Sequence, residues 1–143
     1  MEQMERAFAD TIPSRWIWYW LPVIAYASLI FYLSSLPHPE EDLPKFLFEK
    51  IGDKFLHVIE YAVLGLLCYP AFRRAAGARI AQQAVLVTIL AVSFYAMTDE
   101  VHQAFVPFRE SSWLDWMADT AGGVIGALCA SRMVERATES GIS

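Results

Sequence analysis

The residues best suited to chemistry lie between positions 95 and 123, in the stretch YAMTDEVHQAFVPFRESSWLDWMADTAGG. Carboxylates, a histidine, an amide and an arginine follow one another there at short spacing, while the flanking sequence is apolar. Side chains of these types can transfer protons, bind anions or hold a metal ion. The residues are Asp99, Glu100, His102, Gln103, Arg109, Asp115 and Asp119.

A second polar group stands at the start of the apolar run at residues 55–72. Its members are Asp53, Lys54, His57, Glu60 and Tyr61. Their spacing of three, four and seven residues places them on one side of a helix over two turns. The sequence therefore predicts a polar stripe along the first part of an otherwise apolar helix.

The composition predicts that the chain works in a membrane. Of its 143 residues, 56% are hydrophobic and 14% aromatic, which is too apolar for an ordinary soluble domain. The net charge of −5 and the lack of a basic stripe argue against a nucleic-acid partner. Cys68 and Cys129 lie in apolar runs without CxxC or Cys/His spacing, so we expect them to act as small hydrophobic side chains.

Four stretches approach or reach the roughly 20 apolar residues that a membrane-spanning helix needs. They are residues 16–36, 55–72, 80–98 and 113–131. The predicted fold is therefore an all-α integral membrane bundle of four transmembrane helices. We divide the chain into an N-terminal tail (1–15), a transmembrane domain (16–132) and a C-terminal tail (133–143).

Basic residues predict which side of the membrane each loop faces, because Lys and Arg are retained in the cytoplasm. One side collects seven of them: Arg6, Arg15, Arg73, Arg74, Arg79, Arg132 and Arg136. The other side collects four: Lys45, Lys50, Lys54 and Arg109. Both termini are therefore expected in the cytoplasm. In the first outer loop, 37–54, a short helical segment could lie in the interface through Phe46, Leu47, Phe48 and Ile51.

This topology brings the polar ends of the second, third and fourth helices to the extracytoplasmic face. A charged group in hydrocarbon costs a few kcal/mol, so these side chains should point into the bundle and find partners. Carboxylates outnumber cations among them, which allows for a bound cation or for protonated acids. The simplest alternative is a network that only holds the helices together, at about 1 kcal/mol per hydrogen bond.

Two segments, DKFLHVIEYAVLGLL (53–67) and TDEVHQAFVPFRESSWLDWMADTAGGVIG (98–126), resemble the VanZ-like family of small bacterial integral membrane proteins. Two positions differ from the family pattern: Phe108 stands where Gly is common, and Asp119 where Asn is common. The resemblance implies a multi-pass protein of the bacterial cytoplasmic membrane, related to a teicoplanin-resistance protein. The matching positions are Asp53, Lys54, His57, Glu100, Gln103, Arg109, Ser111 or Ser112, Asp115, Gly122 and Gly126.

We assign candidate roles to residues of both segments. The catalytic set, which would move protons, is His57, Glu60, Glu100 and Asp115. The substrate-binding set is Asp53, Lys54, Gln103, Arg109, Ser111, Ser112 and Asp119. The structural pair is Gly122 and Gly126, a GxxxG motif that lets a neighbouring helix approach closely. No metal ligand and no cofactor is assigned.

The leading hypothesis is a cleft at the extracytoplasmic face that binds an anionic envelope lipid or lipid-linked intermediate. Lys54 and Arg109 would contact its phosphate or carboxylate oxygens, because an arginine fork matches oxyanion geometry. If the site also processes its ligand, His57 would exchange a proton with Glu60 or Glu100. Binding is the first expectation, and catalysis the second.

Two other functions fit the same pattern. A metal-dependent membrane hydrolase would use pairs of residues three or four positions apart, as carboxylate-rich metal bundles do. The pairs are His57 with Glu60, Glu100 with Gln103, and Asp115 with Asp119. A non-catalytic partner subunit would instead use the polar end to meet another envelope protein, and co-purification of a stoichiometric partner would indicate this function.

The predicted topology can be tested by placing reporters on each side of the membrane. A cytoplasmic reporter fused after Ser143 should be active, because the basic count places the C-terminus inside. Glu41→Cys, as the single engineered cysteine, should react with an impermeant thiol reagent added to intact cells. Reaction only after lysis would reverse the orientation and move the polar residues to the other leaflet.

Overall fold

The protein is built of helices throughout the part that the structure describes. The computed structural model describes residues 12–37, 52–109 and 111–141, and no β-strand occurs in these ranges. The predicted all-α class is confirmed. The helices are α2 (Ile12–Ser34), α4 (Asp53–Ala75), α5 (Ala78–Gln82), α6 (Ala84–Gln103) and α7 (Trp113–Glu139).

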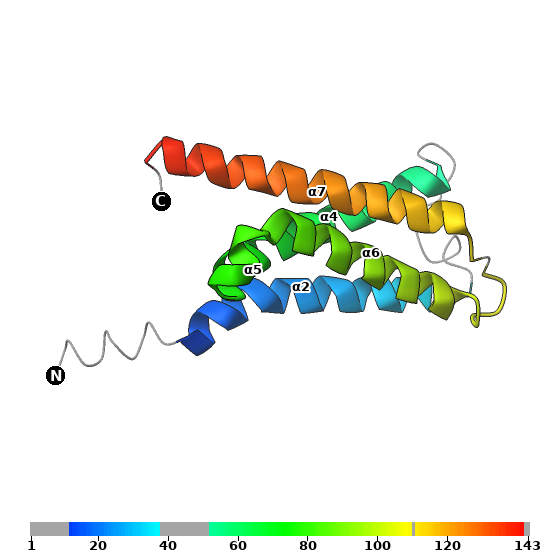
Figure 1. Ribbon diagram of the computed structural model, residues 1–143. Helices are drawn as coiled ribbons and strands as arrows, with labels where there is room; N and C mark the ends of the chain where they lie inside the picture. The colour runs from blue at the N-terminus through cyan, green and yellow to red at the C-terminus, as the bar shows by residue number, and fades with distance from the viewer. Residues whose placement is uncertain (1–11, 38–51, 110, 142–143) are drawn as a thin grey trace.

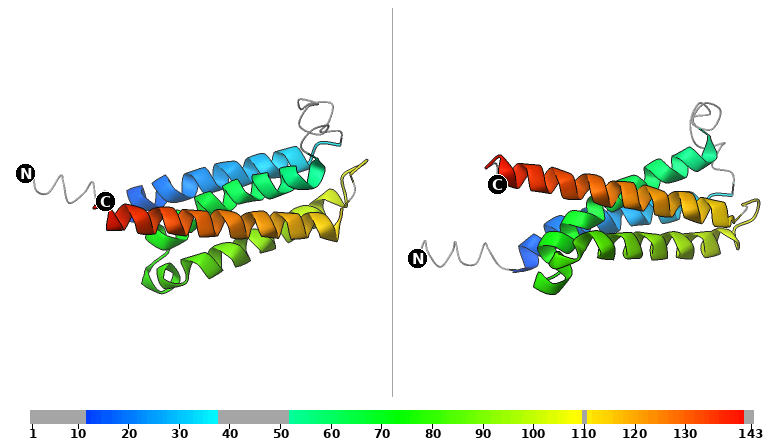
Figure 2. Two further views of the ribbon diagram at one scale, coloured as in Figure 1. Left: turned by 90° about the horizontal axis from the view of Figure 1, so that it is seen from above. Right: turned by 45° about the horizontal axis from the view of Figure 1, so that its top comes forward.

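The long helices lie side by side, and α4 is the central one (Figure 1). It contacts α2, α6 and α7, and its most extensive packing is against α7. The views in Figure 2 show that the start of α4, the end of α6 and the start of α7 lie at one end of the bundle. The polar ends of three helices are therefore neighbours in space.

The observed helix limits differ in places from the predicted spans. The expected third span, 80–98, is two helices, since Gln83 leaves the helical conformation with φ −115° and ψ 23° between α5 and α6. No residue of α5 is buried, so packing does not hold it in line with α6. The predicted interfacial segment in the first outer loop lies outside the described residues.

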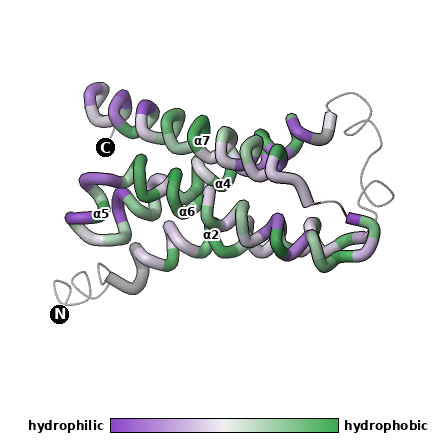
Figure 3. The backbone as a smooth tube through the Cα atoms, turned by 45° about the vertical axis from the view of Figure 1, so that its right-hand side comes forward, coloured by the Kyte–Doolittle hydropathy of each residue, from purple (hydrophilic) through white to green (hydrophobic). Residues whose placement is uncertain are grey.

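Within the part of the chain that the structure describes, three helices are long and apolar enough to cross a membrane: Trp16–Ser34, Lys54–Ala75 and Ala84–Gln103. Helix α7 is 27 residues long but less apolar, because its first half carries acids and glycines. Figure 3 shows apolar residues along the middle of the helices and hydrophilic ones towards the ends of the bundle. This distribution fits a protein whose outer surface faces lipid.

The core extends along α4 from Tyr61 to Ala71. Tyr61 is fully buried there among Ile30, Val92 and Ala96, from α2 and α6. Tyrosine hydroxyls also hold α2 in place, because Tyr95 donates a hydrogen bond of 2.6 Å to the carbonyl of Ala27. In hydrocarbon such a bond satisfies a backbone or hydroxyl group that water cannot reach.

Glycines bring α4 and α7 into backbone contact. A Cβ atom on Gly65 would lie 2.6 Å from the carbonyl oxygen of Gly123. A Cβ atom on Gly122 or Gly126 would run into the backbone of α4, at the carbonyls of Val58 and Ala62 respectively. Small residues are typical of helix contacts in membranes, where close packing replaces the hydrophobic effect as the driving force. The predicted structural pair thus lies directly on α4.

Replacing Gly126 tests whether this contact holds the bundle together. Gly126→Val should lower the free energy of unfolding by about 1–3 kcal/mol, because the new side chain forces the two backbones apart. Ala121→Val is the matched control, since Ala121 is exposed on the same helix. Unfolding would be followed by circular dichroism in mild detergent. Equal stability of the two variants would contradict the close-packing explanation.

Candidate functional site

Every buried carboxylate among the described residues lies at one end of the bundle. These residues are Asp99, Glu100, Asp115 and Asp119, each at most 8% exposed. The first two come from the last turns of α6, and the other two from the first turns of α7. We call this group, with the side chains that contact it, the polar end.

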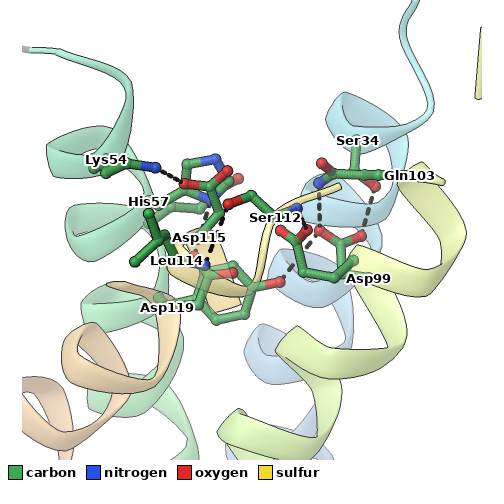
Figure 4. Close-up of polar contacts among 12 residues, drawn as sticks. Ser34, Lys54, His57, Asp99, Gln103, Ser112, Leu114, Asp115 and Asp119 are labelled. Carbon is green, nitrogen blue, oxygen red and sulfur yellow. Dashed lines mark hydrogen bonds and ion pairs between the residues drawn. The ribbon is translucent and has the colours of Figure 1, made fainter. Parts of the chain in front are cut away.

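Two ion pairs join α4 to α7 and lead from the surface inwards (Figure 4). Lys54 pairs with Asp115, and their side chains are 56% and 11% exposed. About one turn deeper, Nδ1 of His57 lies 2.9 Å from Oδ1 of Asp119, whose side chain is fully buried. The pairs stay in register because each helix advances about one turn between them.

Asp99 is fully engaged by neutral donors from three helices. Ser34 donates to its Oδ1 at 2.6 Å, while Gln103 at 3.0 Å and Tyr61 at 3.3 Å donate to Oδ2. Figure 4 shows Ser34 and Gln103 converging on the carboxylate of Asp99. A buried carboxylate satisfied in this way stabilises the helix arrangement.

Glu100 fastens the turn between α6 and α7. Its Oε2 accepts a hydrogen bond of 2.8 Å from the backbone N–H of Ser112. The hydroxyl oxygen of Ser112 caps α7 by accepting from the N–H of Leu114 at 3.2 Å. A serine at this position satisfies an N–H that has no partner within the helix. The start of α7 is thereby fixed beside the end of α6.

Two carboxylate oxygens at the polar end have no hydrogen-bond partner. They are Oε1 of Glu100 and Oδ2 of Asp119, both buried. With His57, these two residues form the group best suited to hold a metal ion, since one donor atom of each lies within 4.8 Å of the others. The three donors come from α6, α7 and α4.

The sequence profile of the VanZ/LLP1 family matches residues 5–134. The chain belongs to this family. The match covers the described helices except the last residues of α7, and the resemblance seen in the two polar segments is confirmed. No curated protein and no solved structure gives a significant match to the chain.

The turn between α6 and α7 of this VanZ/LLP1 chain contains a strained residue. Phe108 has φ 64° and is 81% exposed. This left-handed conformation costs a non-glycine residue about 1–2 kcal/mol. Arg109, the next residue, is half-buried. The chain therefore holds, with a phenylalanine, a backbone geometry that glycine adopts without strain.

The structure gathers many of the predicted site residues. Those joined in the contacts above are Lys54, His57, Glu100, Gln103, Ser112, Asp115 and Asp119. Glu60 is half-buried and accepts a hydrogen bond from Tyr26 through its backbone carbonyl, at 3.2 Å. Ser111 is exposed in the turn. Asp53 begins α4, and its side chain lies outside the described part of the structure.

Ser34, Tyr61 and Asp99 belong to the polar end but received no role from the sequence. Tyr61 stood in the same helical stripe as His57, and Asp99 stood beside Glu100, so both signals were present. Ser34 gave no such signal, because it ends a helix interpreted only as an anchor. The structure makes it a direct partner of Asp99.

His102 is close in sequence to the predicted site residues but received no role from the sequence. It lies in the last turn of α6, with its ring stacked on Phe31 at a centroid distance of 4.4 Å. Its Nε2 lies 3.0 Å from the hydroxyl oxygen of Ser35. His102 therefore connects α6 to the end of α2, outside the group formed by His57, Glu100 and Asp119.

A cavity of about 620 Å³ opens at the opposite end of the bundle, away from the polar end. Tyr69, Arg73, Ser131 and Glu135 contribute to its lining. They come from the second half of α4 and the second half of α7. This cavity and the cleft predicted for the polar end are therefore different features.

Relieving the strain at Phe108 should stabilise the turn. Phe108→Gly is expected to raise the free energy of unfolding by about 0.5–1 kcal/mol, because glycine adopts positive φ without a clash. Phe105→Gly is the control, since Phe105 is equally exposed, at 82%, without a positive φ. Thermal unfolding in detergent would measure both. A loss of stability in both variants would show that the phenylalanine side chain matters more than the backbone.

Proposed function

We propose that the polar end binds an anionic envelope lipid or lipid-linked intermediate at the extracytoplasmic face of the bacterial cytoplasmic membrane. The observation that supports this most is the pair of ion pairs that leads from Lys54, half exposed, to Asp119, fully buried in an apolar bundle. At the outer end of this arrangement the Lys54 ammonium can meet an oxyanion, and partial exclusion of water strengthens that contact. In this proposal α7 is the fourth spanning helix and both termini are cytoplasmic.

Exposed aromatic residues support a position of the polar end at the lipid headgroups. Trp113 is 68% exposed at the start of α7. At the other end of the bundle, Trp16 and Trp18 are 48% and 79% exposed. Aromatic side chains with polar edges prefer the two membrane interfaces. With bands at these two ends, Lys54 would lie near the depth of lipid phosphates.

Two cations would recognise the ligand. Lys54 pairs with Asp115, and an ammonium group has three N–H donors, so it can contact an oxyanion beside a carboxylate. Arg109 lies in the turn next to Phe108, and its planar guanidinium suits bidentate contact with phosphate. A substrate with an anionic headgroup and an apolar tail would satisfy both the cations and the surrounding lipid.

The His57–Asp119 pair supports a catalytic version of this function. A carboxylate that orients an imidazole is the usual arrangement of a general base. His57 is 13% exposed through its side chain, so it lies between the buried acid and the surface. In this version His57 accepts a proton from the attacking group, and Asp119 stabilises the resulting imidazolium.

A purely structural network explains only part of the polar end. Asp99 fits that explanation, because its carboxylate is satisfied by three neutral donors. Glu100 and Asp119 do not fit it, because each keeps a buried oxygen without a partner. An unsatisfied buried group costs about 1–3 kcal/mol, which a network built only for stability would avoid. A protein partner remains the second candidate, tested by co-purification.

The binding function predicts that charge and geometry at the polar end control lipid retention. Native mass spectrometry in mild detergent should detect a co-purified anionic lipid with the wild type. Lys54→Gln and Arg109→Lys should each reduce it at least tenfold, because the first removes a positive charge that would contact the headgroup and the second removes the bidentate geometry. Arg74→Gln and Arg73→Lys make the matched changes at the opposite end and should retain the lipid.

Three results of the same measurement would contradict the proposal. Equal lipid retention in all four variants, at wild-type expression and thermal stability, would return the polar end to a packing role. A stoichiometric protein in place of lipid would favour the partner-subunit function. Loss of lipid from the opposite-end variants alone would move the site to the other leaflet.

A further inference from the structure

One donor from each of three helices meets at the base of the polar end. His57 comes from α4, Glu100 from α6 and Asp119 from α7, and their donor atoms lie within 4.8 Å of one another. Glu100 is 6% exposed and Asp119 is 0% exposed. The two acids of the group are therefore enclosed by the bundle, while His57 is 13% exposed through its side chain.

The two unpartnered oxygens point to a ligand. Oε1 of Glu100 and Oδ2 of Asp119 are buried and accept no hydrogen bond, although each carboxylate is engaged through its other oxygen. Among residues with described burial, no lysine, arginine or histidine is buried to the same degree. An acidic interior without buried cations attracts a positive ion, since carboxylates in low dielectric need compensation.

The donor types and their separation fit a divalent transition metal. Ligand bonds of about 2.0–2.2 Å from imidazole nitrogen and carboxylate oxygen require donors about 3–4 Å apart. The donor atoms observed here lie within 4.8 Å of one another, slightly beyond this range. Imidazole combined with carboxylates suits zinc or manganese, whereas calcium and magnesium favour oxygen ligands alone.

We propose that His57, Glu100 and Asp119 bind one divalent transition-metal ion of the Zn²⁺ or Mn²⁺ class. The ligands are an imidazole nitrogen, Oε1 of Glu100 and Oδ2 of Asp119. The Ser112 N–H keeps Oε2 of Glu100 in place and so orients this ligand. Three protein ligands leave at least one coordination position for water or for an anionic oxygen, which is the arrangement of catalytic rather than structural zinc sites.

This ligand set differs from the one that the sequence alone favoured for a metal enzyme. That hypothesis paired residues along each helix, whereas the structure takes a single donor from each of three helices. Asp115 is engaged with Lys54 instead. The inference goes beyond the proposed lipid-binding function, because the ion can bind in the absence of any lipid.

Metal retention tests the site directly. Protein purified with a histidine-free tag would be stripped of metal with EDTA and then dialysed against Zn²⁺ or Mn²⁺. After desalting, its metal content would be measured by inductively coupled plasma mass spectrometry. We expect about one equivalent and a higher thermal midpoint in the wild type. Asp119→Asn and His57→Gln should each lower retention at least tenfold. His102→Gln, Cys129→Ser and Glu135→Gln remove other donors and should retain the ion.

X-ray absorption of the loaded wild type keeps the test valid if a variant does not fold. The expected first shell contains nitrogen and oxygen with one imidazole, and a shell containing sulfur would assign the ion to cysteine. Retention below about 0.1 equivalent of either ion, in protein that stays folded, would overturn the proposal. So would unchanged retention in both Asp119→Asn and His57→Gln.

Lipid analysis of the same samples separates this inference from the proposed function. An ion bound without lipid would support the metal site and contradict lipid binding. A lipid retained after complete removal of the metal, with no uptake of added ion, would support lipid binding and overturn the metal site. Each result concerns one of the two proposals.

Discussion

The close approach of α7 to α4 determines where the other groups of the polar end can lie. Gly122 and Gly126 contact the α4 backbone at Val58 and Ala62. Asp119 precedes these glycines by three and seven residues, so it lies on the same helix face. At this separation the short side chain of Asp119 reaches His57 directly. A bulkier contact would widen the gap and leave both groups without a partner in an apolar interior.

Buried carboxylates then divide into two kinds. Asp99 receives all its hydrogen bonds from neutral groups and connects α2, α4 and α6. Glu100 and Asp119 each use one carboxylate oxygen in a contact that holds the helices together, and their other oxygen has no hydrogen-bond partner. The first kind explains how the helices are held, and the second indicates what the arrangement is held for. Stability and function thus use neighbouring residues, Asp99 and Glu100, on one helix.

The sequence predicted the helices and the polar stripe because both depend on local periodicity. It also predicted the all-α class and the family. The break at Gln83 was not predicted, because a short exposed helix such as α5 carries little periodic signal. The pairing of His57 with Asp119, rather than with Glu60, could not be read from spacing, since it depends on the angle at which α4 meets α7. The contact of Ser34 with Asp99 was not predicted either, because the two residues are 65 positions apart and meet only through the packing of the helices.

The separation of His57 from Asp119 also has a consequence for biosynthesis. The two residues are 62 positions apart, and the ribosome makes α4 first. At about 5–20 residues per second, roughly 3–12 s pass before the partner carboxylate exists. During this interval only water or lipid headgroups can satisfy the imidazole, which favours keeping the start of α4 at the membrane surface. Translation of α7 then completes both the fold and the burial of its most polar side chains.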